Sequence, residues 1–169
     1  MERTGITTFK GAPVTLAGNE VKVGDMAPDF TALNIDLGPV KLSSFRGQVV
    51  ILSVVPSLDT KVCELQTKRF NEEASKLRAK ILTISMDLPF AQRRFCDSFK
   101  IDNVTTLSDF KDREFGQKYG MTVKELGLLA RGVIVVDKEG KISYIQIVKE
   151  VGTEPDYAPV LAEAKRLGA

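Results

Sequence analysis

The sequence predicts an α/β fold with a central mixed β-sheet flanked by helices. Two apolar runs, residues 49–55 and 132–137, have the length of buried strands. Apolar residues at helical spacing follow the first of these runs and also the strand predicted over residues 80–86. This order of strand, helix, strand and helix, ending in a hairpin and a last helix, is typical of such a sheet.

An N-terminal β-hairpin is expected ahead of this core. Residues 6–10 and 14–16 are strand-like, and the sequence Gly11-Ala12-Pro13 between them favours a turn. Residues 23–42 are rich in breakers and predict a loop followed by a short strand and turn. The run 49–55 is then predicted to be a central strand that pairs in parallel with a neighbour.

Two helices are expected to flank the central strands. The first is predicted from Val62 to about Leu77, and the second follows strand 80–86, with Asp87 as its N-cap and Pro89 in its first turn. The apolar residues expected on the buried faces recur every three or four positions: Val62, Phe70, Ala74 and Leu77 in the first helix, and Leu88, Ala91, Phe95 and Phe99 in the second.

The C-terminal half completes the sheet and adds two helices. A short helix is predicted over residues 112–119, ended by Gly120, and a final helix over residues 155–167. Between them lies a hairpin over residues 132–147. No repeat or linker divides the sequence, so residues 1–169 are expected to form one domain. A thioredoxin-like arrangement fits this order of elements, as do other small α/β folds.

Composition excludes several classes of chemistry. The net charge is +2, too small to indicate a nucleic-acid partner, and 43% hydrophobic with 27% charged residues is ordinary for a globular protein. The chain contains no histidine, which excludes Ser-His-Asp and Cys-His catalysis and histidine metal sites. Two cysteines cannot build a four-thiolate zinc site, so neither a metal nor another cofactor is predicted.

No segment of the sequence predicts export or membrane insertion. The N-terminus lacks the apolar core of a signal peptide, and no run approaches ~18 apolar residues. We therefore expect a cytoplasmic location and no membrane partner. In that compartment the two cysteines are expected to be reduced or redox-active rather than permanently cross-linked.

Cys63 is the residue that points most directly to a function. It stands where an apolar strand and the loop that starts at Pro56 give way to a helical pattern. The positive end of the helix dipole should therefore meet its sulfur. That position favours the thiolate, which is the nucleophilic form of cysteine. The alternative interpretation is a buried, inert cysteine of the core.

Several segments resemble one known family. The spacing Pro56-x3-Thr60-x2-Cys63 resembles the active-site motif of the peroxiredoxins. Other segments resemble the thiol peroxidase subfamily, the atypical two-cysteine group of bacterial peroxiredoxins. These segments occur in matching order along nearly the whole chain: residues 53–60, 87–96, 127–131 and 153–157. One departure is Lys61, where many thiol peroxidases look as if they carry proline. Its positive charge is expected to favour the Cys63 thiolate further.

The resemblance implies a catalytic role for each matching residue. Cys63 would be the peroxidatic cysteine, which attacks a hydroperoxide and becomes a sulfenic acid, and Cys96 would be the resolving cysteine that forms an intramolecular disulfide with it. Thr60 would hydrogen-bond the thiolate and the peroxide, and Pro56 would shape the loop and shield the sulfur. Arg131 would point at the sulfur and stabilise the departing oxygen.

Each of these residues also has a plain structural interpretation. Thr60 is placed to cap a helix, Pro56 to end a strand, Arg131 to lie at the surface beside a strand, and Cys96 to fill the core. A disulfide requires Cα atoms within ~7 Å, a separation that two cysteines near opposite helix ends are not expected to satisfy. Local unwinding around Cys63, Cys96 or both is therefore expected during turnover.

The resemblance also implies substrates and partners. These are hydroperoxides, thioredoxin as the reductant, and a second copy of the chain in a homodimer that shapes the substrate pocket. Leu88, Pro89 and Phe90 are candidates for an apolar pocket wall suited to alkyl hydroperoxides. The expected function is reduction of hydrogen peroxide and alkyl hydroperoxides, in antioxidant defence and redox homeostasis.

Three other functions compete with this one. A thiol–disulfide oxidoreductase is disfavoured because the sequence has no Cys-x-x-Cys. A peroxide-sensing redox switch would use the same two cysteines but would need to react only once. A catalytically inactive thioredoxin-like interaction domain would be expected to lack Thr60 or Arg131, and the chain has both.

Overall fold

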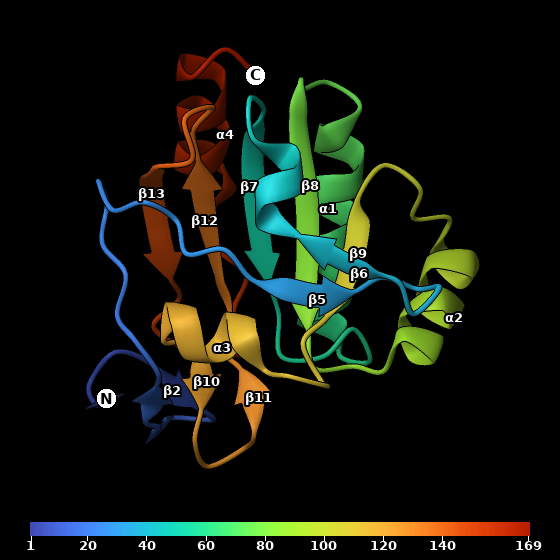
Figure 1. Ribbon diagram of the computed structural model, residues 1–169. Coiled ribbons are helices and arrows are strands. Elements are labelled where there is room, and N and C mark those ends of the chain that lie inside the picture. The colour runs from blue at the N-terminus through green and yellow to red at the C-terminus, as the bar shows by residue number, and fades with distance from the viewer.

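A seven-stranded mixed sheet organises the fold (Figure 1). The computed structural model describes residues 1–169. Along the sheet the strands are β13 (Ile142–Ile147), β12 (Gly132–Val136), β7 (Val49–Val54), β8 (Ala79–Ser85), β9 (Thr105–Ser108), β5 (Thr31–Leu33) and β6 (Pro39–Lys41). The three middle strands β7, β8 and β9 run parallel, and every other pairing is antiparallel. The predicted mixed sheet is therefore confirmed, as is the parallel pairing of the strand that begins at Val49.

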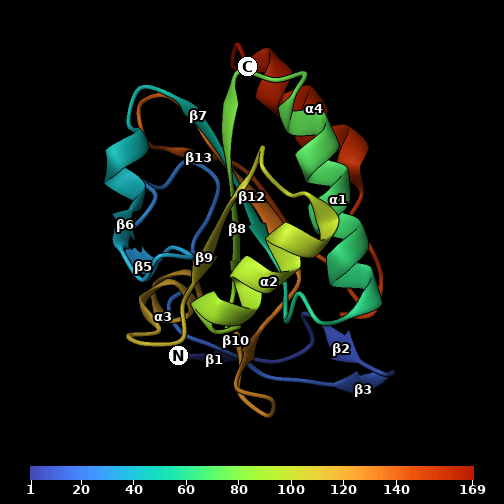
Figure 2. The same ribbon diagram turned by 90° about the vertical axis from the view of Figure 1, so that its right-hand side faces the viewer.

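Helices cover the two faces of the sheet unequally (Figure 2). Three helices pack on one face: α1 (Lys61–Ala74), α2 (Pro89–Phe99) and α4 (Tyr157–Arg166). The other face is covered by α3 (Glu114–Tyr119), which ends at Gly120 as predicted, and by the 3-10 helix η1 (Leu42–Phe45) with the edge strands. Each face has its own apolar core, with 15 buried residues under α1, α2 and α4 and 21 on the opposite side. None of these helices combines the length and the apolar character that a membrane span requires.

The N-terminal segment builds two small accessory sheets instead of one extended hairpin. The predicted hairpin exists as β2 (Thr8–Phe9) and β3 (Ala12–Pro13), but its turn lies at Lys10 and Gly11, which both adopt positive φ. The sequence prediction of a turn over residues 11–13 was therefore wrong. The second sheet contains β1 (Glu2–Arg3), β4 (Leu16–Ala17), β10 (Thr122–Val123) and β11 (Leu128–Leu129). Leu16 consequently pairs with Arg3 and Val123 and not with residues 6–10.

The two helices beside the central strands begin and face differently from the prediction. Asp87 does not cap α2, because Leu88 occupies the N-cap position and no side chain caps the helix. The side chains that α2 buries are Pro89, Gln92, Phe95 and Cys96, whereas Leu88, Ala91 and Phe99 are exposed. In α1 the fully buried side chains are Cys63, Gln66, Thr67 and Phe70, and Val62 lies at the margin. Phe70 and Phe95 are buried as predicted, and Ala74 and Leu77 pack against the same core. The prediction missed the polar residues Gln66, Thr67 and Gln92 on these faces.

Candidate active site

Cys63 lies in the first turn of α1, just beyond the carboxyl end of the central strand β7. The strand ends at Val54, the buried residue Pro56 ends the extended path, and a short turn leads into the helix at Lys61. Cys63 is the third residue of the helix and is fully buried. Its position therefore combines the two features expected from the sequence, a strand-to-helix junction and the positive end of a helix dipole.

The Arg131 side chain reaches the Cys63 sulfur from the end of a neighbouring strand. Arg131 directly precedes β12, which pairs with β7, and its Nη2 lies 3.1 Å from the Cys63 Sγ. Its Nη1 donates to Gln66 Oε1 at 3.0 Å, and its Nε donates to the Val151 carbonyl at 2.8 Å. The side chain is only 2% exposed, so Arg131 is not the surface residue that one sequence interpretation allowed.

No carboxylate pairs with the buried Arg131 guanidinium. Every ion pair of the chain joins other residues, and the contacts of Arg131 are a carbonyl, an amide oxygen and the Cys63 sulfur. A buried cation is strongly unfavourable unless an anion or several acceptors compensate it. Of its three contacts, only the sulfur can carry a negative charge, so the guanidinium is placed to stabilise an anion that develops there.

Gln66 is a site residue that the sequence interpretation missed. It lies one turn after Cys63 on the buried face of α1, and its amide nitrogen donates to Ser53 Oγ at 2.9 Å while its oxygen accepts from Arg131. The side chain thus ties the guanidinium to β7. A polar residue three positions after a candidate nucleophile, on the predicted inner face of a helix, was the signal available in the sequence.

Thr60 is the residue immediately before the first turn of α1. Its hydroxyl donates to the Ser57 carbonyl at 2.9 Å, so it closes the turn and neither caps the helix nor bonds the Cys63 sulfur in this structure. Lys61 differs from its expected role, because its amine lies 3.6 Å from the Glu64 carboxylate and its side chain is 75% exposed. The Lys61 charge is therefore paired and solvated, and the structure gives no support to its expected effect on the thiolate.

Cys96 lies on the buried face of α2 and, like Cys63, is a free thiol. Its sulfur is 3.7 Å from the Thr106 hydroxyl on β9, and burial raises the pKa of its thiol. The two cysteines belong to the same apolar core, but their sulfurs contact residues on opposite sides of the β7–β8 pair. The structure thus holds both thiols apart, each with its own polar neighbour.

A cleft opens between the N-terminal end of α1 and the outer side of α2. Its lining includes Thr60 and Lys61 from one side and Ala91, Phe95 and Phe99 from the other. The three residues proposed as a pocket wall do not line it, because Pro89 is buried while Leu88 and Phe90 are 49% and 67% exposed outside the cleft. Their neighbours Asp87 and Ala91 line the cleft instead.

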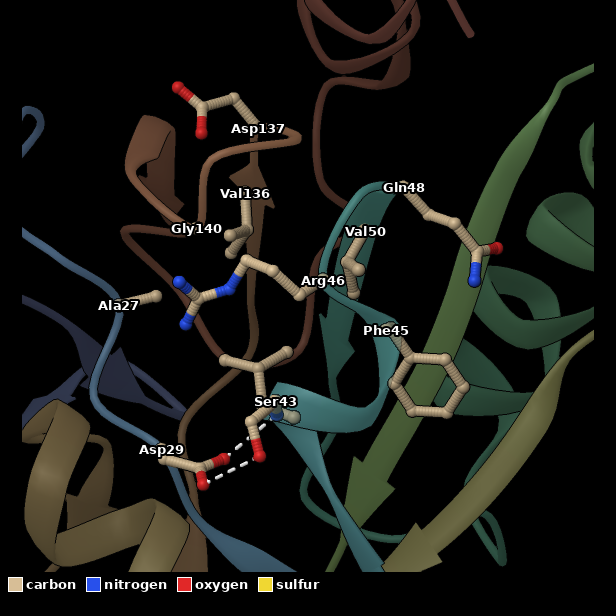
Figure 3. A pocket seen from close by; sticks show the side chains of 11 residues that line it. Ala27, Asp29, Ser43, Phe45, Arg46, Gln48, Val50, Val136, Asp137 and Gly140 are labelled. Carbon is tan, nitrogen blue, oxygen red and sulfur yellow. Dashed lines mark hydrogen bonds between the residues drawn. The ribbon is translucent and has the colours of Figure 1, made fainter.

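A second, smaller pocket lies at the opposite end of β7 (Figure 3). Arg46 spans it, and Asp29 accepts two hydrogen bonds from Ser43 at its edge, at 2.9 and 2.8 Å. Neither cysteine contributes to its lining. Val50 and Val136, which form its floor, are at the far ends of the strands whose other ends hold Cys63 and Arg131, so this pocket is separate from the candidate active site.

The N-terminal hairpin is hydrogen-bonded to Glu150, in the segment whose Val151 carbonyl accepts from Arg131. Glu150 accepts hydrogen bonds from the Thr8 hydroxyl at 2.5 Å and from the backbone of Lys10 and Gly11 at 2.9 and 3.1 Å. These bonds lower the pKa of Glu150 to about 2, and the bond from the Thr8 hydroxyl has the largest effect. The adjacent Val151 carbonyl is the acceptor for Arg131 Nε, so Glu150 anchors a segment that contributes directly to the site.

We predict that Glu150→Gln lowers thermal stability in a pH-dependent way. Because the folded-state pKa of Glu150 lies below its ordinary value of 4.5, the stabilisation by its carboxylate is fully present above pH 4.5 and is lost as the pH falls toward 2. The difference in thermal midpoint between wild type and variant should therefore shrink over that interval. Glu139→Gln, which neutralises an exposed glutamate in a turn, is the control. A difference that stays constant from pH 7 to pH 3 would contradict this prediction.

Comparisons with known proteins agree with this geometry. The family described as Redoxin matches residues 22–161. A thiol peroxidase of Oceanobacillus iheyensis is 55% identical over 160 residues, covering 94% of this chain and 98% of that protein, and a thiol peroxidase of Bacillus subtilis is 53% identical over 161 residues, covering 95% and 96%. A crystal structure of a peroxiredoxin-like protein from Aquifex aeolicus superposes with a TM-score of 0.91 at 46% identity, covering 98% of this chain and 97% of the other.

Proposed function

Because this chain belongs to the redoxin family and, within it, to the thiol peroxidase subfamily of the peroxiredoxins, we propose that Cys63 is its peroxidatic cysteine and Cys96 its resolving cysteine. The chain is a thiol-dependent peroxidase, which reduces a hydroperoxide with electrons from a thiol reductant. The observation that carries the assignment to Cys63 is the 3.1 Å contact between its sulfur and a buried guanidinium that has no carboxylate partner.

In the first step, the Cys63 thiolate attacks the distal oxygen of the hydroperoxide. A sulfur–oxygen bond forms while the oxygen–oxygen bond breaks, so that the sulfur is oxidised to a sulfenic acid and the peroxide is reduced to an alcohol or water. Negative charge moves from the sulfur onto the departing oxygen. Arg131 already points at the reacting sulfur with a fixed guanidinium, so it can stabilise that charge as it develops.

Thr60 and Pro56 support this step from the turn that leads into α1. We assign the Thr60 hydroxyl to the bound peroxide, because Thr60 lines the cleft and a hydroxyl can both donate and accept. While it donates to the Ser57 carbonyl it can still accept from the substrate, and it must give up that bond only to donate. Pro56 is buried at the end of β7 and shields the sulfur from water.

In the second step, the Cys96 thiol attacks the sulfenic acid, forming an intramolecular disulfide and releasing water. Burial raises the pKa of the Cys96 thiol, and its sulfur faces Thr106 and not Cys63, so local unwinding must bring it out first. A dithiol then reduces the disulfide. We propose thioredoxin as that reductant, in keeping with the family.

The same family supports further proposals about the setting of the enzyme. We propose that residues 1–169 form one domain, that the protein is cytoplasmic, and that it acts in antioxidant defence and redox homeostasis on hydrogen peroxide and alkyl hydroperoxides. A homodimer would cover Leu88 and Phe90, which are largely exposed beside the cleft, and would bring Leu88, Pro89 and Phe90 toward a substrate pocket completed by the partner.

A peroxide-sensing redox switch is the alternative function. It would use the same oxidation of Cys63 and the same disulfide. The observation that favours it is that both thiols are buried and face different partners, so disulfide formation requires a rearrangement. Such a rearrangement would change the surface around α1 and α2. Repeated turnover with a dithiol reductant distinguishes the enzyme from the sensor, which needs to react only once.

We predict that Arg131→Ala lowers the second-order rate constant for Cys63 oxidation by about 10²- to 10³-fold, the cost typical of losing one donor to a developing anion. Arg131→Lys retains the positive charge but loses the several N–H donors of the planar guanidinium, and it should give an intermediate rate. An alanine variant that remains folded and oxidises at the wild-type rate would show that Arg131 has no role in the chemistry.

A further inference from the structure

Asp87 joins the turn before Cys63 to the helix that carries Cys96. Its Oδ1 accepts from Ser57 Oγ at 2.7 Å, and its Oδ2 accepts from the Leu58 backbone nitrogen, also at 2.7 Å. The same Oδ2 accepts from Ser85 Oγ at 2.7 Å. One half-buried carboxylate thus receives three short hydrogen bonds, two of them from the active-site turn.

On the other side, this network reaches α2. Ser85 Oγ accepts from the fully buried Gln92 amide at 3.1 Å, and the same amide nitrogen donates to the Leu107 carbonyl at 2.9 Å. Gln92 lies one turn before Cys96 on the same face of α2. The path from the turn at Ser57 to the helix of Cys96 therefore runs through the side chains of Asp87, Ser85 and Gln92.

The turn that Asp87 holds is internally bonded and leads directly to the reactive sulfur. Ser57 Oγ accepts from the Asp59 backbone nitrogen at 3.2 Å, and the Ser57 carbonyl accepts from the Thr60 hydroxyl. Leu58 buries its side chain in the same apolar core as both cysteines. Release of the Asp87 bonds would remove the side-chain contacts that tie this turn to the segment before α2, and would leave its internal bonds and the packing of Leu58.

We propose that Asp87 is a positioning residue that acts as a latch on the active-site turn, and that its bonds set the rate at which the oxidised site unwinds for attack by Cys96. This inference rests on the proposed cycle of Cys63 and Cys96. Hydrogen bonds to a carboxylate are stronger than neutral ones, so three of them to one group hold the folded site firmly. The latch keeps Thr60 and Cys63 arranged for the peroxide, and it delays the disulfide.

The delay has a chemical consequence. While Cys63 is a sulfenic acid, a second hydroperoxide can transfer an oxygen to the sulfur, giving a sulfinic acid and an alcohol or water. Formation of the disulfide competes with that second oxidation. Asp87 therefore determines what fraction of the sulfenic acid becomes the disulfide and what fraction is overoxidised. Weaker hydrogen bonds to Asp87 should slow the first oxidation of Cys63 and accelerate formation of the disulfide.

Asp87→Asn tests the latch, because asparagine keeps the size of the side chain but loses the charge and one acceptor. After one equivalent of hydrogen peroxide, quenched-flow alkylation and mass analysis measure how fast the sulfenic acid becomes the Cys63–Cys96 disulfide. We expect that rate constant to rise roughly tenfold, as loss of one charge-assisted bond allows. The peroxide concentration that overoxidises half of the enzyme should rise in parallel. Ser57→Ala, which removes one donor and leaves the carboxylate, should act in the same direction with a smaller factor.

Two controls separate a latch from a general loss of stability. Asp112→Asn removes one exposed carboxylate from a turn, and Val14→Ala weakens the apolar core on the opposite face of the sheet. Both should leave the rate of disulfide formation unchanged, even where Val14→Ala lowers the thermal midpoint as much as Asp87→Asn does. Unchanged or slower disulfide formation in both Asp87→Asn and Ser57→Ala would overturn the latch. Absence of a Cys63–Cys96 disulfide in the wild type would instead overturn the proposed cycle.

Discussion

A Cys63→Ser variant is expected to lose hydroperoxide consumption entirely. A serine hydroxyl is a poor nucleophile unless a base removes its proton, and the group that contacts position 63 is the Arg131 guanidinium, which cannot accept a proton. Serine also differs from cysteine by only one atom, so the buried turn should retain its fold. Peroxide remaining after incubation with the protein and a dithiol is the measurement, and it should equal that of a sample without protein.

The control for this variant is its thermal midpoint, which should remain close to that of the wild type. Arg131 would then face a neutral hydroxyl in place of a sulfur that can carry charge, so a modest loss of stability is consistent with the assignment. A folded Cys63→Ser protein that still consumed peroxide would place the nucleophile elsewhere, and Cys96 is the one other thiol in the chain.

A Cys96→Ser variant is expected to react once and then stop. Its Cys63 remains next to Arg131 and should consume one equivalent of hydroperoxide at nearly the wild-type rate, because Cys96 contacts neither the sulfur of Cys63 nor the guanidinium. Without a resolving thiol, however, the sulfenic acid accumulates, and thioredoxin-dependent turnover should fall to background. Dimedone labelling measures accumulation of the sulfenic acid, and steady-state assays with thioredoxin measure the loss of turnover.

Two other outcomes of that assay carry information. Full thioredoxin-dependent turnover in Cys96→Ser would show that the reductant itself resolves the sulfenic acid and would remove Cys96 from the cycle. A wild-type protein that forms its disulfide once but is not reduced by any dithiol would favour the sensor over the peroxidase. Cys63 and Arg131 would keep their roles in either case, since both functions begin with oxidation of Cys63.

The elements that could be predicted from the sequence are those whose pattern is set by burial along the chain. Long apolar runs or helical spacing predict strands β7 and β8, the hairpin of β12 and β13, and helices α1 and α4. Strand β9 was missed because its sequence, Thr-Thr-Leu-Ser, lacks such a run, although it is buried between β8 and β5. Its strand conformation comes from pairing with neighbours, which local sequence does not reveal.

The candidate site likewise has one part that local sequence predicts and another that depends on contacts between distant residues. A reactive thiol at a helix N-terminus follows from local sequence, whereas the contact between Cys63 and Arg131 joins residues 68 positions apart and was expected only from the family resemblance. Gln66, Asp87 and Glu150 were missed or misread because their partners lie on other elements. Asp87 illustrates the reason: a carboxylate two residues before a helix has the pattern of an N-cap, but stronger donors in the turn at Ser57 occupy it.

Mass analysis under non-reducing conditions, after one equivalent of hydrogen peroxide, tests whether Cys63 and Cys96 form one intramolecular redox couple. We expect a monomer mass lowered by two hydrogens and, after digestion, a single cross-linked peptide pair that contains Cys63 and Cys96. A disulfide that links two chains, or a protein left with free Cys96 and a stable sulfenic acid on Cys63, would rule out the intramolecular couple.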